Sequence, residues 1–196
     1  MLRLAAALAL TGAIAAGAAS GAEFDAATGY RTDRYRAPVD RPVEGGRQVS
    51  LGEVDRLVAE DRAALIDVMP VRAGYDPLTG RWLLMEPRRN IPGSVWLPEV
   101  GRGALDATIA GYFRGALARL TAERPERPLV FYCMADCWMS WNAVKRAASL
   151  GYRNLYWYAE GSDGWRDADR ALADGDPWPL ETAGGASAVT RREPAR

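Results

Sequence analysis

The only two cysteines of the chain, Cys133 and Cys137, stand in the stretch VFYCMADCWMSW, where an apolar run ends. We expect this run to be a strand, with Cys133 at its carboxyl end and a helix starting near Ser140. Backbone N–H groups and the positive end of a helix dipole favour a thiolate at such a place. They can lower the pKa of a cysteine from about 8.5 to roughly 3.5–7.5. The position therefore predicts that Cys133 is a reactive thiol.

The chain contains no histidine, which removes several classes of chemistry. A Ser-His-Asp or Cys-His triad, a histidine metal ligand and a CxxCH haem attachment are all excluded. The formal net charge is zero, and this argues against nucleic acid or an anionic membrane as the main partner. A thiol here must be activated by the backbone and by the neighbouring side chains.

The second thiol leaves three interpretations open. A disulfide needs Cα atoms about 4.4–6.8 Å apart, and four residues of helix rise by about 6 Å, so Cys133 and Cys137 can reach each other. The pair fits redox or sulfur chemistry, a static disulfide, or a soft-metal site for an ion such as Cu(I). Methionines that could join the thiols around such an ion are Met69, Met85, Met134 and Met139. Only two of these are close to the thiols in sequence, so we assign no metal ligand and no cofactor.

Helical and strand patterns alternate along the middle of the chain and predict an α/β fold. The expected architecture is a central, mainly parallel sheet with helices on both faces. Short apolar runs predict strands at residues 63–68, 94–98, 128–133 and 154–158, of which 128–133 is apolar throughout and therefore central. Helical spacing or capping signals predict helices at 50–61, 106–123, 140–150 and 162–173.

The flanking segments predict an exported protein. Residues 1–22 combine Arg3, an Ala-rich apolar run and a small-residue cleavage site, which is typical of a signal peptide. A membrane anchor is the alternative, but the run is short. We expect a periplasmic protein, free of the membrane after cleavage, with an arm or linker at 23–47, a domain at 48–182 and a disordered tail at 183–196. Residues 71–89 predict a hairpin or flap. Its simpler interpretation is an insertion that covers the core, and a substrate lid is the alternative.

Four motifs in order resemble a rhodanese domain, although none is highly specific alone. They are LIDV with Asp67, NIPGSVWLP at 90–98, PLVFYC ending at Cys133, and GYRNLYWYAEGSDGW at 151–165. The resemblance implies a doubly wound α/β fold and a nucleophilic cysteine that carries a sulfane sulfur as a persulfide. By position Cys133 matches that nucleophile. The implied loop cradle consists of the backbone amides of Met134, Ala135, Asp136, Trp138, Met139 and Ser140.

Two departures from the rhodanese pattern bear on the substrate. Rhodaneses that use thiosulfate commonly have a loop CxxGxR, but here Trp138 or Met139 stands at the position of the Arg. Asn90 stands where that family has a histidine. An oxyanion-gripping guanidinium is therefore missing from the loop, and Arg88 or Arg89 would have to supply the charge from another segment.

The core FYCMADCWMSWNA also resembles an exported rhodanese-like family named for a CXXCW motif and for PQQ-dependent catabolism, although three residues separate the cysteines here. That resemblance implies an accessory role beside a periplasmic quinoprotein dehydrogenase or its cytochrome c. A small sulfur compound or a thiol/disulfide protein is the expected reaction partner.

Three hypotheses follow. The first is a thiol protein in which Cys133 attacks and Cys137 resolves. The second is a non-catalytic docking module, with Trp138 as an apolar rim and an exposed WYAEGSDGW at 157–165. The third is a Cu(I) or other soft-metal carrier. We expect Trp141 to lie in the core, and Asp67 to order the loop after its strand rather than to act as an acid or base.

Overall fold

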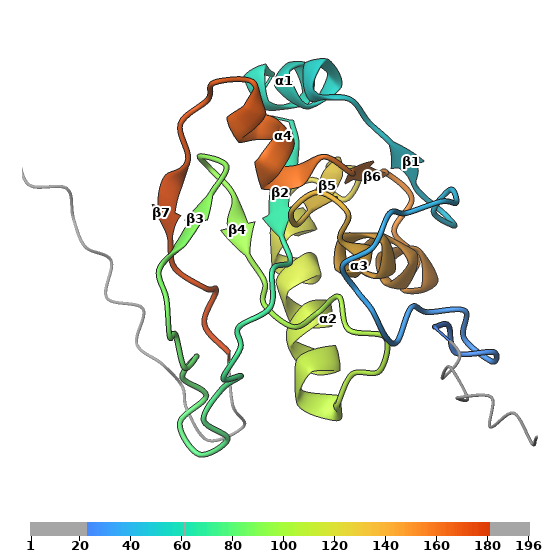
Figure 1. Cartoon of the computed structure of the whole chain (residues 1–196), viewed down its shortest axis with the longest axis vertical. Helices are drawn as coiled ribbons and strands as arrows, with labels where there is room; N and C mark the ends of the chain where they lie inside the picture. Colours follow the sequence, from blue (N-terminus) through green and yellow to red (C-terminus); the bar gives the residue numbers. More distant parts are fainter. Residues whose placement is uncertain (1–22, 61, 181–196) are drawn as a thin grey trace, which may run out of the picture.

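The computed structural model describes residues 23–60 and 62–180. Within them lies a five-stranded sheet in the order β1-β6-β5-β2-β4, with every neighbouring pair parallel (Figure 1). The strands are β1 (Arg47–Gln48), β2 (Ala64–Asp67), β4 (Val95–Trp96), β5 (Leu129–Tyr132) and β6 (Leu155–Tyr158). The α/β prediction is confirmed, and β5 is the central strand as expected.

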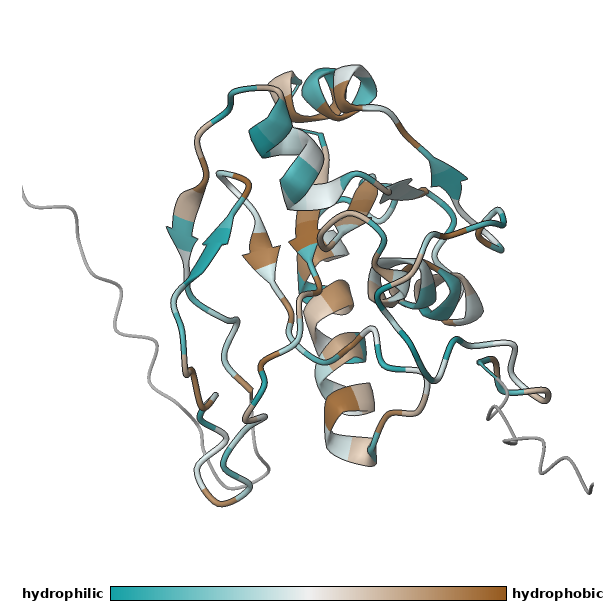
Figure 2. Ribbon diagram, viewed as in Figure 1, coloured by the Kyte–Doolittle hydropathy of each residue, from teal (hydrophilic) through white to brown (hydrophobic). Residues whose placement is uncertain are grey.

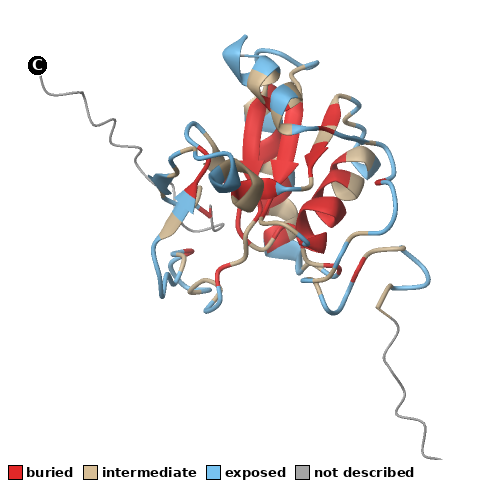
Figure 3. Ribbon diagram, turned by 45° about the horizontal axis from the view of Figure 1, so that its top comes forward, coloured by how far each residue is buried: buried red, intermediate tan, exposed pale blue. Residues whose placement is uncertain are grey.

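Helices cover both faces of the sheet, as predicted (Figure 1). They are α1 (Leu51–Ala59), α2 (Ala107–Thr121), α3 (Trp138–Ser149) and α4 (Gly161–Asp167). Alternate residues of a strand point to opposite faces. Leu129 and Phe131 of β5 accordingly join the core beneath α2 and α3, whereas Val130 and Tyr132 join the core beneath α1. The strands at the centre are apolar and buried (Figures 2 and 3).

Local capping signals explain two of the helix starts. Asp106 accepts the Ile109 N–H at 2.8 Å and starts α2. The Ser50 N–H donates to Glu53 at 3.0 Å and starts α1. Helix α3 begins at Trp138, two residues before the predicted start, because Cys137 adopts the extended conformation of a cap residue.

Two short strands lie outside the sheet and were not predicted. Strand β3 (Arg88–Asn90) pairs antiparallel with β7 (Ala173–Gly175). Before β3, residues 71–87 form a turn closed by a bridge between Tyr75 and Trp82. The Trp82 Nε1–H donates to the Trp178 carbonyl at 2.9 Å, which anchors this flap to the core. The flap therefore covers core residues, as the simpler interpretation expected.

The predicted arm at 23–47 lies against α3, and its last residue enters β1. Arg31 is buried, its N–H donates to Asn142 Oδ1 at 2.9 Å, and its carbonyl accepts from Asn142 Nδ2 at 2.8 Å. The predicted signal peptide at 1–22 and the predicted tail at 183–196 fall outside the described residues. Among the residues that are described, no helix is both long and apolar enough to cross a membrane.

Candidate functional site

Both cysteines lie at the carboxyl end of β5, within the hydrophobic core, and both are free thiols. Cys133 is fully buried, and Cys137 is 7% exposed. Cys133 and Cys137 lie close enough for each thiol to shift the pKa of the other. Cys133 Sγ also lies 3.5 Å from Met69 Sδ. Three sulfur-bearing side chains therefore gather at the end of the central strand.

The thiol with the lowered pKa is Cys137, whereas the sequence predicted a lowered pKa at Cys133. The hydrogen bond from Cys133 lowers the pKa of Cys137 despite its burial, and the backbone N–H groups of Met139, Met134 and Ser140 lower it further. Their influence is electrostatic, since the Cys137 side chain makes no regular capping hydrogen bond. Burial, followed by the contact with Cys137, raises the pKa of Cys133 well above its ordinary value. Of the two thiols, Cys137 is therefore the one that loses its proton first as pH rises.

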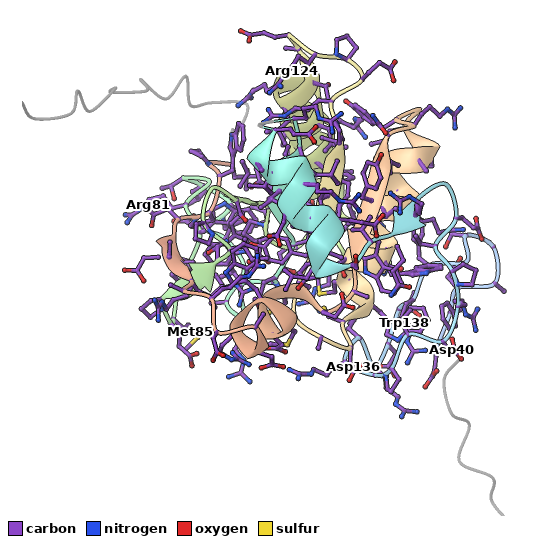
Figure 4. The ribbon with its side chains drawn as sticks, turned by 90° about the horizontal axis from the view of Figure 1, so that it is seen from above. Asp40, Arg81, Met85, Arg124, Asp136 and Trp138 are labelled. Carbon is purple, nitrogen blue, oxygen red and sulfur yellow. The ribbon has the colours of Figure 1, made fainter. Side chains whose placement is uncertain are left out.

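Only part of the predicted backbone cradle faces the thiols. The N–H groups of Met134, Met139 and Ser140 favour the Cys137 thiolate. The Ala135 N–H instead donates to Asp163 Oδ2 at 3.2 Å, and the Trp138 N–H donates to the Tyr35 carbonyl at 2.8 Å. Asp136 is exposed, with a φ of +55°, and lies at the periphery in Figure 4. Contacts with Tyr35 and Asp163 therefore hold the loop in place. A sequence motif does not reveal such contacts between distant segments.

Trp138 is not an apolar rim, contrary to the prediction. Its side chain is only 1% exposed, because the arm covers it: Phe24 makes an edge-on contact with a centroid distance of 5.1 Å, and the Arg31 guanidinium lies 4.9 Å from the ring centroid. Trp141 lies in the core, as predicted. The segment 157–165 is also less exposed than expected, since Trp157 and Tyr158 are buried.

Asp67 orders its surroundings, as expected from its place after β2. Its Oδ1 accepts the Met69 N–H at 2.9 Å, and its Oδ2 accepts from Arg88 Nε at 2.9 Å and from Asn90 Nδ2 at 3.1 Å. Burial raises the pKa of Asp67 to about 6, although Arg88 and the Met69 N–H oppose this. Asn90 Oδ1 is buried without a hydrogen-bond partner. Of the two arginines considered as a source of charge, Arg88 reaches the site, whereas Arg89 donates to the Leu172 carbonyl.

A cavity of about 540 Å³ lies beside the thiols. Its walls come from the arm, the loops after β2 and β5, the flap, β3 and β4: Arg36, Met69, Pro70, Val71, Arg72, Leu84, Met85, Glu86, Pro87, Arg88, Trp96 and Met134. Met69 both lines the cavity and contacts Cys133 Sγ. The fully buried thiol therefore lies one side chain behind the cavity wall. Arg36, which sequence reasoning missed, also pairs in a β-bridge with Cys137 and donates to Met134 Sδ.

The fold and the site define an α/β protein with a buried cysteine directly after the central parallel strand. The chain belongs to the rhodanese-like domain family, whose sequence model matches residues 50–168. Membership of this family supports a sulfur-transfer kind of function. No curated protein sequence matches the chain significantly.

Several solved structures are similar in fold. Thiosulfate sulfurtransferase from Pseudomonas aeruginosa is 17% identical, with a TM-score of 0.45 over 70% of this chain and 22% of that one. The anaerobic ergothioneine biosynthesis enzyme from Chlorobium limicola is 18% identical, with a TM-score of 0.43 over 66% of this chain and 32% of that one. The human single-domain sulfurtransferase TSTD1 is 26% identical, with a TM-score of 0.40 over 62% of this chain and 96% of that one. The chain thus spans a third or less of the first two enzymes.

Proposed function

We propose that the protein carries out dithiol sulfur chemistry, accepting a sulfane sulfur or reducing a disulfide with Cys137 and Cys133. The observation that supports this most is the pair of free, interacting thiols after β5, one with a lowered and one with a raised pKa. Position in the family points to Cys133 as the nucleophile. The charge distribution and the greater exposure of Cys137 favour Cys137 for the first attack, and we adopt that order.

The reaction balances without a cofactor. The Cys137 thiolate attacks the terminal sulfur of a persulfide RSSH, a Cys137 persulfide forms, and RS⁻ leaves. An external thiol then takes the sulfur, or Cys133 loses its proton and attacks the same Cys137 sulfur, releasing HS⁻ and closing a Cys133–Cys137 disulfide. With a disulfide RSSR the same two attacks release two RS⁻, so two protein thiols are oxidised while the substrate is reduced.

Single-cysteine variants test both the function and the order of attack. After exposure to glutathione persulfide or glutathione disulfide, mass spectrometry of Cys133→Ser should show a sulfur or glutathione adduct trapped on Cys137. The Cys137→Ser variant should be labelled at least tenfold more slowly, because its remaining thiol is buried and has a raised pKa. If Cys137→Ser is instead labelled faster than Cys133→Ser, Cys133 makes the first attack. Two thiols that stay free and unreactive in the unmutated protein would rule out the function.

We further propose that the protein works in the periplasm beside a quinoprotein dehydrogenase or its cytochrome c. The signal-like N-terminus and the resemblance to the CXXCW-motif family support this. Exposed apolar side chains on the flap, Leu78, Leu83, Leu84 and Met85, offer a contact surface for a protein partner. Cell fractionation tests the location. If the Cys133→Ser/Cys137→Ser double variant retains its function in cells, docking rather than thiol chemistry is the role.

A further inference from the structure

We propose that Cys133, Cys137 and Met69 form a binding site for one Cu(I) ion in the reduced protein. Cys133 Sγ contacts Met69 Sδ at 3.5 Å, and the buried Cys137 side chain belongs to the same core cluster and interacts with the Cys133 thiol. Two thiols and a thioether are the ligand set that favours Cu(I). The site goes beyond sulfur transfer, because it needs neither a persulfide nor a change of oxidation state.

The spacing of the sulfur atoms suits a small ion. Ligands held about 2.3 Å from a metal stand roughly 4 Å apart. Cys133 Sγ and Met69 Sδ therefore need to move apart by only a few tenths of an ångström from their observed 3.5 Å contact. Met69 lines the cavity as well as touching Cys133, so only this side chain separates the Cys133 thiol from the cavity. Three of the four methionines after Met1 line this cavity: Met69, Met85 and Met134.

The charges around the cluster also suit a monovalent cation. Cu(I) bound to two thiolates carries one net negative charge, because the thiols lose their protons when they bind the metal. The N-terminus of α3 and the nearby Arg88 guanidinium oppose that charge. Within the described residues, no group of three Cys, Asp or Glu side chains gathers to suit a harder ion.

Met69 gives the sharpest test, since Met69→Leu conserves the apolar volume and removes only the thioether. The matched control is Met85→Leu: Met85 lines the same cavity, but its side chain is 73% exposed (Figure 4). The full chain is reduced, kept anaerobic and titrated with Cu(I) against bicinchoninate. Circular dichroism of each variant checks that it remains folded.

One equivalent of Cu(I) should bind the unmutated protein. Cys133→Ser and Cys137→Ser should each weaken binding at least a hundredfold, Met69→Leu about tenfold, and Met85→Leu not measurably. Absence of a one-to-one complex would overturn the proposal, as would a Met69→Leu affinity equal to that of the unmutated protein. Equal losses in Met69→Leu and Met85→Leu would likewise reject it. Persulfide formation is measured separately, so failure of the metal site leaves the proposed sulfur chemistry standing, and the reverse also holds.

Discussion

Removal of the Cys133 side chain should make Cys137 a weaker acid. The hydrogen bond from Cys133 is the largest influence that lowers the pKa of Cys137. Hydrogen bonds to charged groups contribute about 1.5–3 kcal/mol. Since 1.4 kcal/mol is a factor of ten, Cys133→Ala should reduce the acid dissociation constant of Cys137 roughly ten- to a hundredfold. Cys133→Ser is the matched variant, because its hydroxyl keeps a donor at the same place and should preserve most of the effect.

The assay is a pH titration of the thiolate by ultraviolet absorbance, supported by the pH dependence of iodoacetamide alkylation. Each variant leaves one thiol, so the signal belongs to Cys137 alone in the Cys133 variants and to Cys133 alone in Cys137→Ala. A pKa of Cys137 that is the same in Cys133→Ala and Cys133→Ser would refute the role of the hydrogen bond and leave the α3 N-terminus as the cause. A lowered pKa for Cys133 in the Cys137→Ala variant would refute the assigned distribution of charge.

Three further perturbations test the elements around the thiols. Asp67 has a folded-state pKa of about 6, above the ordinary 3.8, so its ionisation should cost the folded state roughly 3 kcal/mol as pH rises from about 4 to 6; Asp67→Asn should remove that decline. Asn142→Ala breaks buried hydrogen bonds to Arg31 and should cost about 2–4 kcal/mol and speed tryptic cleavage of the arm. Gly161→Ala forces a Cβ to 2.6 Å from the Cys133 carbonyl oxygen at a φ of +56°, which should cost at least about 2 kcal/mol.

Urea unfolding at a series of pH values measures all three. For Asp67, the free energy of unfolding is plotted against pH for Asp67→Asn and for the unmutated protein. Two parallel curves would contradict the raised pKa of Asp67. For Asn142, unchanged cleavage of residues 23–47 would mean that the arm is held without this side chain. Gly115→Ala in α2 is the control for Gly161→Ala, because its added Cβ meets nothing within 4 Å. It should stabilise the protein by up to about 1 kcal/mol, and similar behaviour at the two glycines would refute the close contact.

The elements that carry strong local patterns were predictable, and the contacts of the site mostly were not. The run before Cys133 is apolar throughout, so its central place in the sheet follows from burial on both faces. Asp67 was correctly expected to order the loop after β2. The position of Trp138 depends on Phe24 and Arg31, more than 100 residues earlier in a segment without periodicity. Strands β3 and β7 have three residues each and are mostly polar, so neither produces a pattern that stands out from a loop.

The distribution of charge at the thiols has a further consequence for the substrate. Arg88 brings positive charge to the site, but its guanidinium already donates hydrogen bonds to Asp67. It is therefore not free to bind an anionic substrate. Adding an oxyanion next to the Cys137 thiolate would place a second negative charge beside the first, opposed mainly by backbone N–H groups. An uncharged sulfur–sulfur bond adds no charge, and Cu(I) neutralises one. The same electrostatics therefore favour persulfides, disulfides and a soft monovalent cation over thiosulfate at the reacting sulfur.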